Sequence, residues 1–261
     1  SGSVVRAETG GVPAGLFHSA DGGDSWTLCE SLWSVPERKE WGGAGNMTPA
    51  LHTILVEKGD PRRIVVAIST GGVYRTEDGG RTWDGRATGW RAEYYPPELA
   101  SVHYHQDVHR VGRCAAAPQA LWAQHHNGVF RSTDGGKAWT EIKGVKPSVF
   151  GFAVAAHPKD PETAWFVPAQ KDEVRAPVGG RFVVNRTRDG GRTFETLTAG
   201  LPNTAAYDLV YRHGLDVDGS GERLAMGSTT GGLWVSESGG ERWTLLSVHL
   251  PPIYGVRFAP S

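Results

Sequence analysis

Short runs of alternating apolar and polar residues recur along the chain, and no segment has a convincing helical period. Five of these runs lead through Ser or Thr into a glycine doublet, which is the pattern of a strand that enters a tight turn. The runs lie at 15–17, 72–74, 128–130, 182–184 and 232–234. An aromatic residue follows each turn and marks the start of the next strand.

The five turns are copies of one motif, which predicts a repeat architecture. Most copies read Asp-Gly-Gly at the centre, where the Asp side chain accepts hydrogen bonds from backbone N–H groups and Gly adopts positive φ without strain. The third position of the motif is Asp21, Asp78, Asp134, Asp189 and Ser238, with steps of 57, 56, 55 and 49 residues. The motif accounts for ten of the 36 glycines, so they are turn residues rather than a linker.

Two further apolar segments precede most of these runs, so each unit is predicted to contain four short strands, A to D. Strand A is predicted at 52–56, 110–114, 150–154 and 207–211, and strand B at 63–69, 120–124, 163–167 and 223–227. The repeat turn joins strand C to strand D. Four antiparallel strands per repeat of about 52 residues, arranged around a ring, make a propeller.

The two ends of the chain supply the parts of one remaining blade. Residues before Leu28 supply strands B, C and D, and residues 253–258 supply a lone strand A. We therefore predict an all-β fold with a single domain over residues 1–261. This domain is a five-bladed β-propeller of four-stranded antiparallel blades, closed by pairing of the N- and C-terminal strands at 3–7 and 253–258. The alternative is a fragment of a six- or seven-bladed propeller.

The five turn segments resemble the Asp-box, or BNR, repeat, S/T-x-D-x-G-x-S/T-W/F. The first, second and fourth copies match it fully, whereas Ala138, Ser238 and Arg242 depart from it in the third and fifth. With segments 33–38, 149–152 and 215–218, the chain looks like bacterial BNR-repeat proteins labelled sialidase-like or exo-sialidase. The repeat marks a fold that proteins of different chemistry share, so the resemblance implies the propeller but not the activity.

Composition narrows the classes of partner. The chain has 27 Lys+Arg against 28 Asp+Glu, and this balance excludes nucleic-acid binding by general electrostatics. No apolar stretch approaches the roughly 20 residues of a membrane helix. The start at Ser1 shows no secretory signal, so a cytoplasmic protein is expected, with its true N-terminus missing. Two cysteines do not make a disulfide framework. We expect a monomer without cofactor or metal.

Three long connections, at 29–50, 85–108 and 169–181, interrupt the repeat and are predicted to wall one pocket on the face opposite the Asp boxes. Such loops are usually functional. Their aromatic and charged residues suit a glycan or another polar small molecule, and the tryptophans at 33, 41 and 90 are expected to be exposed. The predicted ligand-binding residues, on these loops and on strands near the channel, are Arg38, Trp41, Arg91, Tyr94, His109, Arg113, His125, Lys171, Tyr207, Arg212, Tyr254 and Arg257.

The sequence contains no complete set of catalytic residues. The resemblance to sialidases implies three arginines around a substrate carboxylate, a Tyr–Glu nucleophile pair and an acid Asp, but the N-terminal Arg motif of that family is absent. Asp208 on strand A, with Asp172 and Glu173 in the third long connection, are candidate general acids or bases. The alternatives to a ligand-binding propeller are a sialidase-like glycosidase, a protein-interaction scaffold, and a metal-dependent enzyme using the histidines at 103, 105, 109, 125 and 126.

Overall fold

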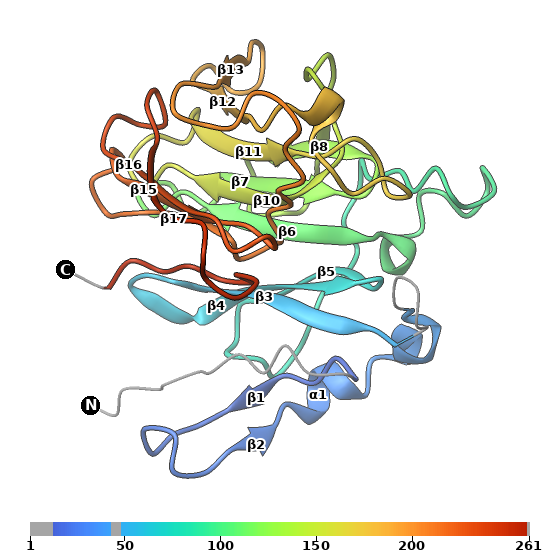
Figure 1. The fold of residues 1–261 in the computed structure, drawn as a ribbon. Helices are drawn as coiled ribbons and strands as arrows, with labels where there is room; N and C mark the ends of the chain where they lie inside the picture. The colour runs from blue at the N-terminus through green and yellow to red at the C-terminus, as the bar shows by residue number, and fades with distance from the viewer. Residues whose placement is uncertain (1–12, 43–47, 260–261) are drawn as a thin grey trace. The chain divides into compact units, whose positions relative to one another are not determined.

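The computed structural model describes residues 13–42 and 48–259. The chain divides into two compact units, residues 1–108 with 136–139 (unit 1) and residues 109–135 with 140–261 (unit 2). Its regular structure is almost entirely antiparallel β-sheet (Figure 1), in five sheets whose strands follow one another in chain order. This is the strand order of propeller blades, so the predicted all-β repeat is confirmed.

Unit 1 contains two of the sheets. The first pairs β1 (Phe17–His18) with β2 (Thr27–Leu28), and the second has the order β3 (Ala50–Glu57), β4 (Asp60–Ser69), β5 (Gly72–Thr76). In the second sheet the fourth strand is reduced to a single bridge between Arg75 and Asp84. The long connections hold short helical turns, namely α1 (Glu30–Trp33), η1 (Pro36–Glu40) and η2 (His103–His105).

The other three sheets have four strands each and belong to unit 2, with the start of β6 at the boundary between the units. They are β6 (Val108–Arg113), β7 (Leu121–His125), β8 (Gly128–Ser132) and β9 (Thr140–Ile142); β10 (Gly151–Ala156), β11 (Ala164–Pro168), β12 (Val184–Thr187) and β13 (Glu195–Leu197); and β14 (Leu215–Val217), β15 (Leu224–Gly227), β16 (Leu233–Ser236) and β17 (Thr244–Ser247). A 3₁₀ turn, η3 (Val178–Gly180), lies between β11 and β12.

The Asp boxes form the turns that the sequence predicted. Both glycines of every box have positive φ, between +60° and +104°. In the fourth box Asp189 accepts hydrogen bonds from the Thr193 hydroxyl (2.6 Å) and the Thr193 N–H (2.9 Å), and Thr187 donates to it as well (3.0 Å). These bonds, that of the Thr193 hydroxyl first, lower the pKa of Asp189 to about 2. In the fifth box Ser238 replaces the Asp, and its hydroxyl oxygen accepts from Arg242 N–H (3.1 Å) and lies 3.4 Å from the Ser236 hydroxyl.

Neighbouring sheets of unit 2 pack through large aromatic side chains. Trp165 on β11 and Trp234 on β16 are almost fully buried in one hydrophobic cluster. The indole N–H of Trp165 donates to the carbonyl of Gly239 in the fifth box (2.8 Å), and Arg186 of β12 donates to the same oxygen (2.8 Å). The box of one sheet therefore accepts hydrogen bonds from the sheet before it, which links the two.

The inner strand of the last sheet is not where the sequence predicted it. Strand A was expected at 207–211, but the structure forms β14 (Leu215–Val217), which pairs with β15. The segment 207–211 is irregular because its polar groups are bound to the turn between β15 and β16. Asp208 accepts a hydrogen bond from Ser228 (2.8 Å), and Leu209 accepts one from Thr229 (2.9 Å). Tyr207, Asp208 and Arg212 are therefore connection residues and not strand residues.

The predicted closing strand at 253–258 is also absent as a strand. This segment, with Tyr254 and Arg257, forms a single parallel bridge between Gly255 and His213. The predicted partner segment, 3–7, lies outside the described residues, so closure through the two termini stays a prediction.

Helical structure in the described residues is limited to single turns, as α1 has four residues. Accordingly, no helix among residues 13–42 and 48–259 has the length and apolar character needed to span a membrane. Both cysteines are free thiols, with Cys29 partly exposed and Cys114 buried.

Candidate functional site

A cavity of about 460 Å³ in unit 2 is lined by two of the predicted ligand residues, Arg212 and Tyr254. Its lining residues are Arg175, Tyr211, Arg212, His213 and Tyr254. We call this cavity the arginine pocket, because two of its five lining residues are arginines and none is acidic. Its volume falls in the range of small-molecule sites.

The connections that build the arginine pocket all lie at one end of their sheets. Arg175 belongs to the connection between β11 and β12, Tyr211 and Arg212 precede β14, and Tyr254 follows β17. In an antiparallel blade these connections leave the end opposite the C-to-D turns, where the Asp boxes lie. Within unit 2, the pocket therefore lies at the end of the sheets opposite the Asp boxes, where the sequence predicted a ligand site.

Phe152 of β10 supports the arginine pocket. The guanidinium carbons of Arg175 and Arg212 lie 5.3 Å and 5.7 Å from the centre of its ring, and the Tyr211 ring lies 5.0 Å away. His109, a predicted ligand residue, stacks on Phe152 at 4.5 Å. Cation–π contacts of this kind orient a guanidinium without using its hydrogen-bond donors. His109 thus contacts the ring that supports both arginines.

Two further arginines contact His213 from outside the lining. Arg110 donates to His213 Nδ1 at 2.7 Å, and Arg257 donates to the same nitrogen at 3.2 Å. A guanidinium has donors only, so the imidazole of His213 is the acceptor in these contacts. His213 therefore links two cationic side chains at the edge of the pocket.

Two carboxylates balance part of this positive charge. Asp172 pairs with Arg175 at 2.6 Å, and Asp216 pairs with Arg257 at 3.5 Å. Burial lowers the pKa of Arg175, but its hydrogen bonds to Asp172 and Tyr211 outweigh burial and raise the pKa above its ordinary value. Arg175 is thus held in the charged form that an anionic ligand requires.

Tyr211 and Tyr254 form an aromatic ledge beside the arginines. Their rings stack with centres 6.0 Å apart and planes 27° from parallel. Tyr254 is 63% exposed, so its ring face is available to a ligand. The exposed Tyr254, stacked on half-buried Tyr211 next to the guanidinium groups, offers a stacking surface and charged hydrogen-bond donors together.

Other predicted residues of unit 2 do not line the arginine pocket. Lys171 and Glu173 pair with each other on an exposed turn (3.4 Å), and Tyr207 is 74% exposed. Asp208 is bound to the hydroxyls of Ser228 and Thr230. Half-buried Arg113 and fully buried His125 do not line the pocket either, and the Nδ1 of His125 accepts from Asn127 N–H (3.0 Å). The catalytic or binding roles of these residues stay predictions.

Four residues of this site, Arg110, Arg175, Tyr211 and His213, are not among the ligand residues predicted from the sequence. Arg175 lies in the third long connection and Tyr211 and His213 flank Arg212, so proximity to predicted residues was the one available signal. Nothing in the sequence places Arg110 of β6 against His213, because about a hundred residues separate them.

The predicted residues of unit 1 are held in loop packing. Arg38 lies over the Trp33 ring (3.9 Å), while Trp41 is buried and donates its indole N–H to the Tyr74 hydroxyl (3.0 Å). The expectation that Trp41 and Trp90 are exposed is wrong, since they are 5% and 3% exposed. Both indoles turn inward because aromatic partners meet them there: Tyr74 for Trp41, and Trp139, 4.4 Å away, for Trp90.

The second long connection is held by its own tyrosines and histidines. Arg91 pairs with Glu93 (2.6 Å), and the Tyr94 hydroxyl donates to the carbonyl of His105 (2.9 Å). His105 also stacks on Tyr95 with ring centres 4.2 Å apart. In unit 2, the rings of His109 and His126 lie 5.6 Å apart. The metal-dependent alternative stays a prediction.

Unit 1 contains a Tyr–Glu pair of the kind that the resemblance to sialidases implies. Tyr74 donates its hydroxyl to Glu37 Oε1 (3.0 Å), and His103 Nε2 lies 3.3 Å from the same oxygen, so the first two long connections meet here. Burial raises the pKa of Tyr74 far above its ordinary value, and the ring is fully enclosed. In the structure this pair and His103 hold the first two long connections together.

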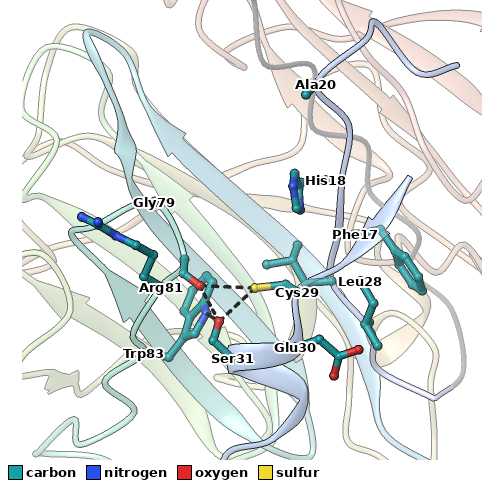
Figure 2. Close-up of a pocket in the computed structure, with 12 residues that line it drawn as sticks. Phe17, His18, Ala20, Leu28, Cys29, Glu30, Ser31, Gly79, Arg81 and Trp83 are labelled. Atoms are coloured by element: carbon teal, nitrogen blue, oxygen red, sulfur yellow. Dashed lines mark hydrogen bonds between the residues drawn. The ribbon is translucent and has the colours of Figure 1, made fainter. Parts of the chain in front are cut away.

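A second cavity, of about 480 Å³, lies in unit 1 beside the first two Asp-box sheets. Figure 2 shows the thiol of Cys29 and the hydroxyl of Ser31 turned toward the Gly79–Gly80 turn of the second box. Ser31 and Cys29 both donate to the Gly80 carbonyl, and Trp83 donates to Ser31 (3.2 Å). These polar groups satisfy one another, so they hold α1 against the box.

Comparison with known proteins supports the fold. No family model and no curated protein matches the chain. Among solved structures, the chain is similar to an ancestral GH74 enzyme, with 18% identity, a TM-score of 0.56, and coverage of 79% of this chain and 24% of that one. It is also similar to YCF48 bound to D1 peptide, with 16% identity, a TM-score of 0.57, and coverage of 94% and 66%.

A third similar structure is the beta-propeller domain of Myceliophteria thermophila Cps50 (Swd1), with 11% identity, a TM-score of 0.52, and coverage of 80% of this chain and 61% of that one. The chain thus spans about a quarter of the GH74 enzyme and about two thirds or less of the other two. At these identities the likeness shows the fold alone, which is an all-β propeller fold.

Proposed function

We propose that this chain is a ligand-binding propeller of the sialidase-like, Asp-box type. Its arginine pocket takes the anionic group of a polar small molecule or glycan. The observation that carries the proposal is the convergence of Arg175 and Arg212 on Phe152, beside the Tyr211–Tyr254 ledge.

The chemistry of these side chains favours an acidic ligand with a ring. A guanidinium matches the two oxygens of a carboxylate with two parallel N–H groups, which a lysine does not do. The ring of Tyr254 presents an apolar face on which the carbon face of a sugar can stack. An acidic sugar satisfies both groups at once, whereas a neutral sugar leaves the arginines without a matching anion.

The comparisons suggest one alternative activity and one further class of ligand. One similar protein is a GH74 enzyme, which keeps the glycoside hydrolase alternative open, and another is YCF48 bound to a peptide. A peptide carboxylate presents the same anion to Arg212 as an acidic sugar does. An acidic peptide therefore belongs among the probes.

The test compares probes that differ in the carboxylate alone. Glucuronic-acid-terminated and glucose-terminated oligosaccharides form one pair, sialyllactose and lactose a second, and an acidic peptide with its amidated form a third. Calorimetry on the native protein should detect the acidic member of one pair and not its neutral counterpart. A hydrogen bond to a charged group contributes about 1.5–3 kcal/mol, so Arg212→Ala should weaken binding roughly 10- to 150-fold.

Arg242→Ala is the matched control, because Arg242 is an exposed arginine of the same unit on the fifth box. It should bind as the native protein does. Equal affinity for acidic and neutral probes, or an Arg212→Ala variant that binds as tightly as Arg242→Ala, would contradict the proposal. Binding of the acidic peptide alone would assign the pocket to a peptide partner.

A further inference from the structure

The segment 251–259, which follows β17, contributes to the arginine pocket although it is weakly packed. We call it the strap. None of its nine residues is buried. It nevertheless supplies Tyr254 to the lining and Arg257 to His213. A segment with this exposure belongs to the part of a fold that opens most easily.

Among the residues that the structure describes, few bonds hold the strap to the rest of unit 2. Val256 N–H donates to the carbonyl of His213 (2.8 Å), beside the single bridge at Gly255. Phe258 N–H donates to a carboxylate oxygen of Asp216 (2.9 Å). Arg257 pairs with that same carboxylate at 3.5 Å. All these contacts are made to residues 213–216, just before and within β14.

The start of the strap is anchored more firmly than the rest. Ile253 N–H donates to the carbonyl of Ser228 (3.0 Å), and the Ile253 side chain packs so closely on Gly227 that no Cβ fits between them. Beyond Ile253, the bonds that join the strap to other described residues end on residues 213–216. An opening motion would therefore pivot at Ile253 and carry Tyr254 and Arg257 away together.

We propose that the strap docks and undocks as a unit and that ligand binding is coupled to its docking. The inference rests on the proposed function of the arginine pocket. In the docked state Tyr254 forms one wall of the pocket, and Arg257 adds positive charge at His213. A ligand that touches this wall binds the docked state more tightly, so it shifts the equilibrium toward docking by that difference in affinity.

Val256→Pro tests this coupling, because proline has no N–H to donate to His213. The variant keeps Tyr254, Arg257 and every pocket arginine. Sialyllactose, or whichever acidic probe binds the native protein, should bind Val256→Pro at least about 10-fold more weakly. Trypsin should cleave after Arg257 faster in this variant than in the native protein. In the native protein the acidic probe should slow that cleavage, whereas lactose should not.

Ala259→Pro is the control, because it places a proline in the same strap at an exposed residue beyond the docking bonds. It should match the native protein in both readouts. Hydrogen exchange of the Val256 and Phe258 amides in the native protein, with and without the probe, gives a measurement that needs no variant. Both amides should exchange more slowly with the probe bound.

The outcomes separate the two proposals. If the native protein binds an acidic probe but Val256→Pro binds it equally well and the probe changes neither cleavage nor exchange, the strap proposal fails and the proposed function stands. If the native protein binds none of the probes, the proposed function fails and the strap proposal falls with it.

Discussion

Two buried tryptophans of unit 2 provide a matched test of the link between sheets. Trp165 and Trp243 belong to the same hydrophobic cluster and are 1% and 2% exposed. Trp165 donates its indole N–H to Gly239, whereas the indole N–H of Trp243 has no acceptor among the described residues. Replacing either by Phe removes the same volume and one N–H, so the two variants differ mainly in the hydrogen bond.

The hydrogen bond sets the size of the expected difference. Trp165→Phe loses a net contribution of about 1 kcal/mol, and the Gly239 carbonyl keeps Arg186 as a donor, so it is not left unpaired. In the native protein, the lack of an acceptor for the buried Trp243 N–H costs about 1–3 kcal/mol of stability. Trp243→Phe removes this donor and regains that free energy. The loss of packing is similar in both variants and cancels in the comparison. Trp165→Phe should therefore be less stable than Trp243→Phe by at least about 2 kcal/mol.

Equilibrium unfolding in urea, followed by circular dichroism, measures this difference. At equal m-values, the free energies of unfolding of the two variants should differ by at least about 2 kcal/mol, and a difference of about 2 kcal/mol corresponds to about 4–8 °C in Tm. Circular dichroism is preferred because each variant loses a fluorescent indole. Equal stability of the two variants, or a more stable Trp165→Phe, would refute the role given to the Gly239 carbonyl.

Two further predictions concern the turns. Gly200 and Gly144 both have positive φ, but a Cβ at Gly200 would overlap the carbonyl of Trp243, whereas a Cβ at Gly144 meets open space. Gly144→Ala should cost about 1–2 kcal/mol and Gly200→Ala more than about 3 kcal/mol, and equal costs in urea unfolding would contradict this. The pKa of Asp189 is lowered to about 2 in the fold, from an ordinary 3.8. The ionised Asp189 carboxylate therefore stabilises the fold fully above about pH 4, and this stabilisation is lost as the pH falls toward 2. Asp189→Asn should flatten the native Tm profile between pH 2 and 4, and an unchanged profile would count against the role of the box.

The repeat could be predicted because its chemistry is local. In the fourth box, the bonds to Asp189 come from residues within four positions in the chain, and the glycine doublet needs positive φ in every copy. Each box therefore specifies its own turn, and the strands on either side of it follow. The inner strand of the last sheet lies farther from its box, and the prediction failed there. Both 207–211 and Leu215–Val217 alternate, and the bond from Ser228 to Asp208 decides between them.

The exposure of the loop tryptophans could not be predicted either. Trp41 and Trp90 lie in long connections, where a sequence pattern does not show which way a side chain turns. Their burial depends on Tyr74 and Trp139, which other parts of the chain bring to them. Trp41 and Trp90 therefore do not indicate a ligand surface.

The candidate site was predictable in part. Arg212 and Tyr254 were chosen from the sequence and do line the arginine pocket, whereas His213 and Arg175 were missed. The sequence by itself determined the turns, the strand repeat and the propeller fold class, because those depend on hydrogen bonds and φ preferences within a few residues. Only the tertiary structure decided the pocket. Its arginines and tyrosines come from connections that follow three different strands, and they meet because the sheets of unit 2 pack around Phe152.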